Sequence, residues 1–252
     1  EWAPRAPGLK TVEDALEIRR RVLYAYEAAE RELDPDRQRE WLTFVVIGGG
    51  PTGVELAGAL AEISRQTRAR DFRNIDPKRA RVVLLEGLPR VLTAYSEDLS
   101  EKAKRSLVHL GVEVHVSTMV TAIEGHVVRS KSMSIASRTV IWAAGVAASP
   151  LVRSLGVELD KAGRVQVTPM LTVPGHDEIF VAGDLVNLTL DGKELPGLAP
   201  VAMAEGKHAA RNILRAARAQ PTVSRIPSRA SIVSPSQNSR ASAARSWPSH
   251  SG

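Results

Sequence analysis

The chain has 252 residues, a length typical of one or two domains. Hydrophobic residues make up 43% and charged residues 25%, which excludes wholesale disorder and the collagen-like and coiled-coil classes. The absence of cysteine excludes disulfide frameworks, iron–sulfur clusters, thiolate metal sites and cysteine nucleophiles.

The net charge of +6 is concentrated at one end of the chain. Residues 216–252 carry five arginines and no acidic residue. This segment is rich in Ser, Arg, Pro and Ala without helical or strand periodicity, so we expect a disordered tail. An arm for nucleic acid or an anionic membrane is the alternative, but no aromatic residues are interleaved for base stacking. We therefore predict no nucleic-acid partner.

Membrane and signal segments are not evident. No apolar run reaches the ~18 residues of a membrane span. The longest candidate is 140–148. The first residue is Glu rather than Met, with no apolar signal region after it, so we expect the chain to begin within a longer protein.

The first predicted element after a coil at 1–9 is a long helix. Thr11 is its candidate N-cap, with Asp14 three residues later, and we expect Pro35 to close the segment. Apolar residues recur there at helical spacing, which predicts one buried face: Ala15, Ile18, Val22, Tyr26 and Ala29.

Residues 43–116 alternate between strand and helix patterns. An apolar strand at 43–47 enters a glycine turn and is followed by a helical stretch. A second strand is predicted at 81–86, a helix from the cap Ser96 to the stop Gly111, and a third strand at 112–116. Weak alternation at 120–139 predicts short antiparallel strands, and 139–144 a buried strand ending at Gly145. We predict an α/β fold, a Rossmann-like unit with an antiparallel insertion.

Beyond this unit the patterns are shorter. Residues 179–182 predict a short buried strand that runs into Gly183 and Asp184. Residues 201–217 predict the last helix.

The fingerprint Gly48-x-Gly50-x-x-Gly53 carries the clearest chemistry. It follows a strand and opens a helix, the context of a dinucleotide-binding turn. Pro51 fits the first helical position, and Thr52 lies in the same turn, where free amides attract a pyrophosphate. A tight turn without a ligand is the alternative.

Glu86 ends the second predicted strand, where a carboxylate can accept bonds from both adenosine ribose hydroxyls. It would repel a 2′-phosphate, which favours NAD over NADP. It lies farther from the glycines than the usual ~20 residues, so we expect an insertion after the first helix. An exposed strand-end acid without a ligand is the alternative.

Other site classes find little support. None of the six histidines pairs at metal-ligand spacing, so we predict no metal site. No serine lies in a nucleophile elbow, which argues against a hydrolase.

Several motifs resemble one family. The segments 48–58, 84–86, 140–145 and 179–184 occur in the order found in flavoprotein reductases that bind two dinucleotides. The segments 7–20 and 195–202 are similar, more specifically, to type II NADH dehydrogenase, the single-subunit NADH:quinone oxidoreductase. This resemblance covers residues 1–215.

The resemblance implies an NAD-binding domain at 42–150 inserted into an incomplete FAD-binding domain, whose pieces are a helical segment at 1–41 and 151–215, with the tail at 216–252. Hydride would pass from nicotinamide C4 to flavin N5, and electrons would then pass to a quinone. A cytoplasmic location is implied, and the inner face of the cytoplasmic membrane and a homodimer are compatible with it.

The resemblance also implies site residues. Gly183 and Asp184 would bind the flavin ribityl chain, and the helix beginning at Val201 and Ala202 would direct its amides at the flavin. Ala144 and Gly145 would belong to the nucleotide site. Glu55 would relay protons near the nicotinamide. From the residues alone, Asp184 could instead be a helix cap, and Glu55 a surface acid stabilised by the helix dipole.

The chain departs from the family at three places. It has one glycine fingerprint where FAD binding needs a second, so we expect the isolated chain not to retain FAD. Pro200 and Ala204 replace glutamines that are frequent in the family, and the Ser/Arg tail replaces an amphipathic membrane anchor, so peripheral membrane contact would need the missing C-terminus. The alternatives are a non-catalytic NAD-binding fragment and a ferredoxin or rubredoxin reductase, which 195–202 disfavours.

Overall fold

The structure is a computed structural model that describes residues 2, 4–66, 72–145, 148–190 and 192–224. The chain forms two compact units, Glu1–Gly145 and Val146–Gly252, and each is described here by itself. Most of the predicted tail, residues 225–252, lies outside the described residues.

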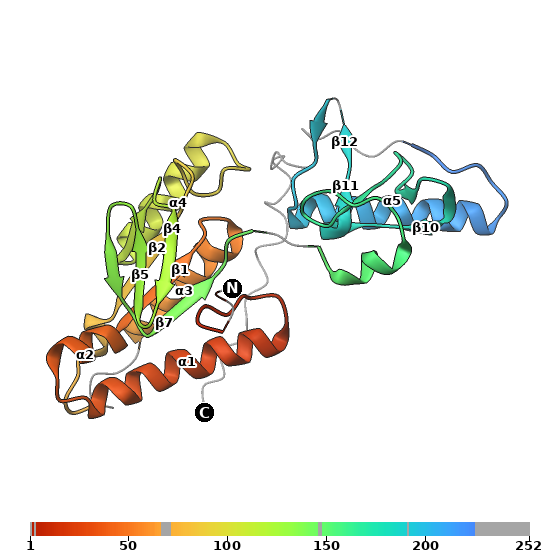
Figure 1. Cartoon of the computed structure of the whole chain (residues 1–252). Helices are drawn as coiled ribbons and strands as arrows, with labels where there is room; N and C mark the ends of the chain where they lie inside the picture. Colours follow the sequence, from red (N-terminus) through yellow and green to blue (C-terminus); the bar gives the residue numbers. More distant parts are fainter. Residues whose placement is uncertain (1, 3, 67–71, 146–147, 191, 225–252) are drawn as a thin grey trace, which may run out of the picture. The chain divides into compact units, whose positions relative to one another are not determined.

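A parallel four-stranded sheet is the centre of the first unit (Figure 1). Its strands lie in the order β3-β2-β1-β7 and comprise β1 (Thr43–Ile47), β2 (Arg81–Leu85), β3 (Val112–His115) and β7 (Thr139–Trp142). In the register, Val45 lies opposite Val83 on one side and Val140 on the other. The predicted Rossmann-like α/β fold is therefore confirmed.

Alternate residues of β1 point to different layers because side chains alternate across a strand. Phe44 and Val46 pack in a core with the helices α1 (Val12–Arg31), α3 (Pro51–Gln66) and α4 (Glu97–His109). Val45 and Ile47 pack in a second core with the antiparallel sheet β4 (Val120–Glu124), β5 (Val127–Ser130) and β6 (Ser134–Ala136). The predicted antiparallel insertion is confirmed, and it covers the sheet face opposite the helices.

Helix α1 begins as predicted. The Thr11 hydroxyl accepts from the Asp14 amide at 3.1 Å, and the Asp14 carboxylate accepts from the Thr11 amide at 3.0 Å, which completes a capping box. Ile18, Val22 and Tyr26 are buried against the sheet, whereas Ala15 is exposed because it precedes the packed part of the helix. The helix shares this core with β1, and the assignment of residues 1–41 to a flavin domain stays a prediction.

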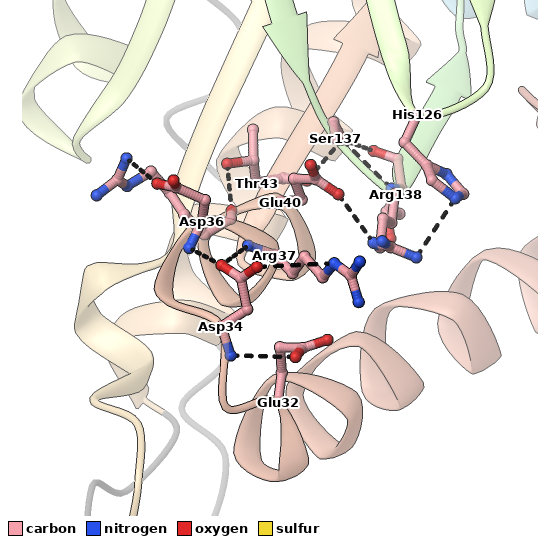
Figure 2. Close-up of polar contacts among 11 residues, drawn as sticks. Glu32, Asp34, Asp36, Arg37, Glu40, Thr43, His126, Ser137 and Arg138 are labelled. Atoms are coloured by element: carbon pink, nitrogen blue, oxygen red, sulfur yellow. Dashed lines mark hydrogen bonds and ion pairs between the residues drawn. The ribbon is translucent and has the colours of Figure 1, made fainter.

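The expectation that Pro35 only ends a helix is wrong. Helix α1 ends at Arg31, and Pro35 begins a short helix, α2 (Pro35–Trp41). Proline is favoured in the first helical turn because its missing N–H needs no partner there. The Asp34 carboxylate caps this helix by accepting from the Asp36 amide at 2.9 Å (Figure 2).

Helix α4 starts after the predicted cap Ser96, whose side chain makes no capping hydrogen bond. Gly111 follows its C-cap with φ of +84°, the left-handed conformation that ends helices. In the described part of the connection from α3 to β2, a 3-10 turn, η2, covers Pro77–Arg79.

The described part of the second unit contains short elements and a long helix. Its strand pairs are β8 (Val165–Gln166) with β11 (Val186–Asn187), β9 (Thr172–Val173) with β10 (His176–Phe180), and β12 (Thr189–Leu190) with β13 (Lys193–Glu194). Two 3-10 turns, η3 (Pro150–Leu155) and η4 (Gly183–Leu185), accompany the helix α5 (Ala199–Ala217).

The buried strand predicted at 179–182 is only partly confirmed, since the strand ends at Phe180 and Val181, the buried residue at 6% exposure, follows it. The observed strand β10 covers His176–Phe180, and its residues are exposed or half-buried. Its only strand partner in the described part of the chain is β9, which covers a single edge. The last helix is found where predicted, starting two residues earlier.

Candidate nucleotide and flavin sites

The glycine turn between β1 and α3 is packed so closely that two of its positions exclude a side chain. Gly48 has φ of +111°, and a Cβ placed there would lie 2.5 Å from the Ala144 nitrogen. A Cβ on Gly53 would lie 1.8 Å from the Gly48 carbonyl oxygen. The close packing of strand, turn and helix that the fingerprint predicts therefore depends on both glycines.

The middle glycine faces open space. No heavy atom lies within 4 Å of a Cβ placed on Gly50. The first helical bond at this turn joins the Val54 amide to the Gly50 carbonyl at 3.0 Å. Within the described residues, the amides of Thr52 and Gly53 have no acceptor, and Pro51 has no N–H. This open helix N-terminus has the geometry of an anion site.

The turn lies where the sheet reverses its order. Strands β2 and β7 pair with opposite sides of β1, so the strand order changes direction between β1 and β7, which is a topological switch point. Ala144 and Gly145 follow β7 there, and the Ala143 amide donates to the Ile47 carbonyl at 2.7 Å. Ligands of open α/β sheets bind at such points. The structure therefore brings Gly48, Gly53 and Ala144 together.

Glu86 follows β2 and reaches back to the glycine turn. Its Oε2 accepts from the Gly49 amide at 2.5 Å, and its Oε1 accepts from the Leu88 amide at 2.7 Å. A carboxylate oxygen can accept more than one bond, so both oxygens keep capacity for hydroxyl donors. The Gly49 contact joins the acid to the fingerprint, and no pattern in the sequence indicated it.

Glu55 lies in the second turn of α3, and its side chain is exposed. It has no ion-pair or hydrogen-bond partner within the described residues. The role of Glu55 as a proton relay near the nicotinamide stays a prediction.

The predicted flavin residues surround a cavity of about 270 Å³ in the second unit. Gly183 and Asp184 contribute from η4, and Val201 and Ala202 from the first turn of α5. Eight further residues complete the lining: Ala162, Arg164, Val186, Leu195, Pro196, Gly197, Leu198 and Glu205. Four residues predicted from two separate motifs, 179–184 and 195–202, thus line the same cavity.

The charges in this cavity are unevenly compensated. Arg164 forms ion pairs with Asp160 at 2.7 Å and with Glu194, so its charge is already matched. The Asp184 carboxylate has no donor within the described residues. A free carboxylate beside a helix N-terminus suits a ligand that offers hydroxyl donors at one end and an acceptor at the other.

Glu205 was missed by the sequence analysis. It is 2% exposed, and its Oε2 accepts from the Gly183 amide at 2.7 Å. Burial raises the pKa of its carboxyl, the Gly183 bond opposes this, and the charge of Asp184 adds to it. The available indication was its spacing, because the buried face of α5 repeats at Val201, Glu205, His208 and Asn212.

In the described ranges, no group of three or more His, Asp or Glu side chains could bind a metal ion. None of the helices described is long and apolar enough to cross a membrane.

Comparison with known proteins identifies relatives. Residues 3–206 match the family model described as pyridine nucleotide-disulphide oxidoreductase. The chain is 43% identical over 221 residues to the type II NADH:quinone oxidoreductase Ndh of Mycobacterium tuberculosis, covering 84% of this chain and 47% of the relative. It is 34% identical over 213 residues to the type II NADH:quinone oxidoreductase of Staphylococcus haemolyticus, covering 81% of this chain and 51% of the relative.

Among solved structures, NDH2 from Plasmodium falciparum in complex with NADH superposes with a TM-score of 0.64 at 21% identity. The match covers 74% of this chain and 41% of that one, and it supports the fold. The chain spans about half the length of the curated relatives that it matches.

Proposed function

The chain belongs to the pyridine nucleotide-disulphide oxidoreductase family, and from this we propose that its whole protein is an FAD-dependent NADH dehydrogenase. Hydride would pass from NADH to the flavin, and electrons would leave to a quinone. The names of the relatives, type II NADH:quinone oxidoreductase, support this reaction class. These 252 residues contain no cysteine, so none of them could supply a redox disulfide.

The observation that carries the proposal is the joining of Glu86 to the glycine turn at the switch point of the sheet. The open amides of Thr52 and Gly53 would bind the pyrophosphate, because a helix N-terminus attracts anions. Glu86, fixed by Gly49, would accept bonds from the ribose hydroxyls and repel a 2′-phosphate. Gly48, Gly50, Pro51, Ala144 and Gly145 would shape the same site. The ligand that suits this arrangement is NADH.

The cavity in the second unit fits one end of FAD. Asp184 would accept bonds from ribityl hydroxyls, and Gly183 would keep it in place. The α5 amides near Val201 and Ala202 would stabilise negative charge on the reduced ring. When bound, FAD would accept two electrons from NADH and pass them on to a second substrate.

The finer assignments rest on the resemblance. We propose that Glu55 moves a proton between solvent and the reacting groups, which its exposed position on α3 would permit. A homodimer and contact of the whole protein with the inner face of the cytoplasmic membrane are proposed on the same ground.

Calorimetric titration of the 252-residue chain tests nucleotide binding. NADH should bind, and NADPH should bind more weakly. Equal affinity for the two, or no binding of NADH, would remove the basis of the proposal.

Absorbance tests the flavin assignment. The isolated chain should purify without the yellow flavin band and without NADH:quinone turnover, because the FAD pyrophosphate lacks its own glycine fingerprint. A longer chain that includes an upstream fingerprint should gain both, and Asp184→Ala in that chain should lose the flavin. If the longer chain binds NADH but never flavin, the protein is a non-catalytic nucleotide-binding module.

A further inference from the structure

An exposed methionine lies directly beside the ribose-binding acid. A Cβ placed on Gly87, the residue after Glu86, would lie 2.5 Å from the Met119 Cε and 3.2 Å from its Sδ. The thioether end of Met119 therefore occupies the space that any side chain at position 87 would take. Met119 is nevertheless 64% exposed, so most of its apolar surface remains available.

Backbone bonds fix the methionine in this place. The Thr118 amide donates to the Glu86 carbonyl at 2.7 Å, and the Ser117 amide donates to the Leu88 carbonyl at 2.8 Å. The segment 117–119 thus runs beside 86–88 at the carboxyl end of the sheet. Leu88, in the same short segment, is also exposed, at 50%.

The location suits one part of a dinucleotide. If Glu86 accepts bonds from the adenosine ribose, the base attached to that ribose must lie within a few ångströms of the same carboxylate. Adenine offers a flat aromatic face, and methionine sulfur makes favourable contacts with aromatic rings. The exposed side chain of Met119 beside the acid provides an apolar surface that such a face would cover.

We propose that Met119 is a specificity-determining residue for the adenine base of the dinucleotide. Its side chain, which lies over Gly87, forms the apolar wall against which the base packs. Gly87 matters because a side chain there would displace the end of Met119. This inference rests on the proposed function, since it needs the ribose at Glu86.

The test measures affinity and base preference on the 252-residue chain by calorimetry. The probes are NADH and reduced nicotinamide cytosine dinucleotide, which differ only in the base. Met119→Ala should weaken NADH about five- to twentyfold, the loss expected for one apolar and sulfur–aromatic contact. Met119→Leu should restore affinity to within about threefold, because it keeps the apolar bulk.

Base preference separates a direct contact from a structural role. The wild type should bind NADH more tightly than the cytosine analogue, and Met119→Ala should reduce that ratio. A general loss of folding would weaken both ligands equally and lower the melting temperature. Met203→Ala is the matched control, because Met203 is 63% exposed on α5 in the other unit and should change neither affinity.

The outcomes distinguish the two proposals. If the wild type binds neither dinucleotide, the proposed function fails. If the wild type binds NADH but Met119→Ala stays within twofold of it, or keeps the same base preference, the inference is wrong and the nucleotide site stands.

Discussion

The buried carboxyl of Glu205 accepts a hydrogen bond of 2.7 Å from the backbone amide of Gly183. This contact joins α5 to the turn that carries Asp184, so one side chain links two of the elements that line the cavity. Gly183 has φ of +78°, a conformation that L side chains rarely adopt. The bond therefore stabilises a turn whose shape determines where the Asp184 carboxylate lies.

The first prediction concerns the pH dependence of stability at Glu205. Burial raises the pKa of this carboxyl above 4.5 in the folded state. Below pH 4.5 the group is protonated in both states and carries no penalty. As the pH rises above 4.5, Glu205 loses its proton in the unfolded chain before it does so in the folded protein. The free energy of unfolding therefore falls until the pH has passed the folded pKa.

Glu205→Gln keeps an acceptor for the Gly183 amide but cannot ionise. The melting temperature of the wild type should therefore drop relative to this variant between pH 4 and pH 8, as followed by calorimetry. Glu158→Gln, at an exposed position, is the control for the same substitution outside the cavity. A Glu205→Gln difference that does not change with pH would contradict the prediction.

The second prediction separates the two roles of the fingerprint glycines. Gly53→Ala should lower the free energy of unfolding by roughly 3 kcal/mol, because overpacking against the Gly48 carbonyl cannot be relieved by a side chain. Gly50→Ala should leave stability within ~0.5 kcal/mol, since its methyl meets no atom within 4 Å.

Gly50→Ala should nevertheless weaken NADH, because the methyl would occupy the path by which a pyrophosphate approaches the backbone. Urea unfolding and calorimetric titration measure the two effects. Unchanged NADH affinity in Gly50→Ala or in Gly53→Val would show that the turn does not bind the nucleotide.

The third prediction concerns the choice between NADH and NADPH. Glu86→Gln keeps an acceptor for the Gly49 amide and removes the charge that would repel a 2′-phosphate. NADH should weaken about threefold, and NADPH should strengthen about tenfold, a change of ~1.4 kcal/mol. Glu124→Gln, an exposed acid on β4, should alter neither. Glu86 would lose its assigned role if the ratio of the two affinities stayed constant in Glu86→Gln.

The fourth prediction concerns Arg138, which fixes α2 to the sheet. Its Nε lies 3.1 Å from the Glu40 carboxylate (Figure 2). Its guanidinium lies 4.6 Å from the centre of the Trp41 ring. A nitrogen of the same group lies 3.3 Å from His126. Both charged side chains of the Glu40 pair are largely shielded, with 20% and 26% of their surface exposed.

Arg138→Met should therefore lower the free energy of unfolding by about 1–2 kcal/mol, the combined loss of the ion pair and the cation–π contact. Arg138→Lys should recover part of the lost free energy of unfolding, because lysine keeps the charge but lacks the planar guanidinium. Urea denaturation measures both. Arg37→Met is the control, since its ion pair with Asp34 is exposed and 3.8 Å long. Equal effects of the two methionine substitutions would contradict the prediction.

Much of the first unit followed from the sequence. The strand at Thr43–Ile47, the glycine turn and the cap at Thr11 lie where they were predicted. These features depend on apolar periodicity and on backbone conformations that particular residues favour, which act over a few neighbouring positions. The small second unit was less predictable, because two-residue strands carry no periodicity.

The candidate site, too, was partly predictable from the sequence and partly dependent on the tertiary structure. The sequence alone predicted the candidate site residues, from Gly48 to Asp184, because residue type and local spacing single them out. Only the tertiary structure decided that Glu86 bonds to Gly49, that Met119 covers Gly87, and that Glu205 supports Gly183. Each of these contacts joins segments brought together by strand pairing or helix packing. Their geometry depends on distances through space, which no local pattern encodes.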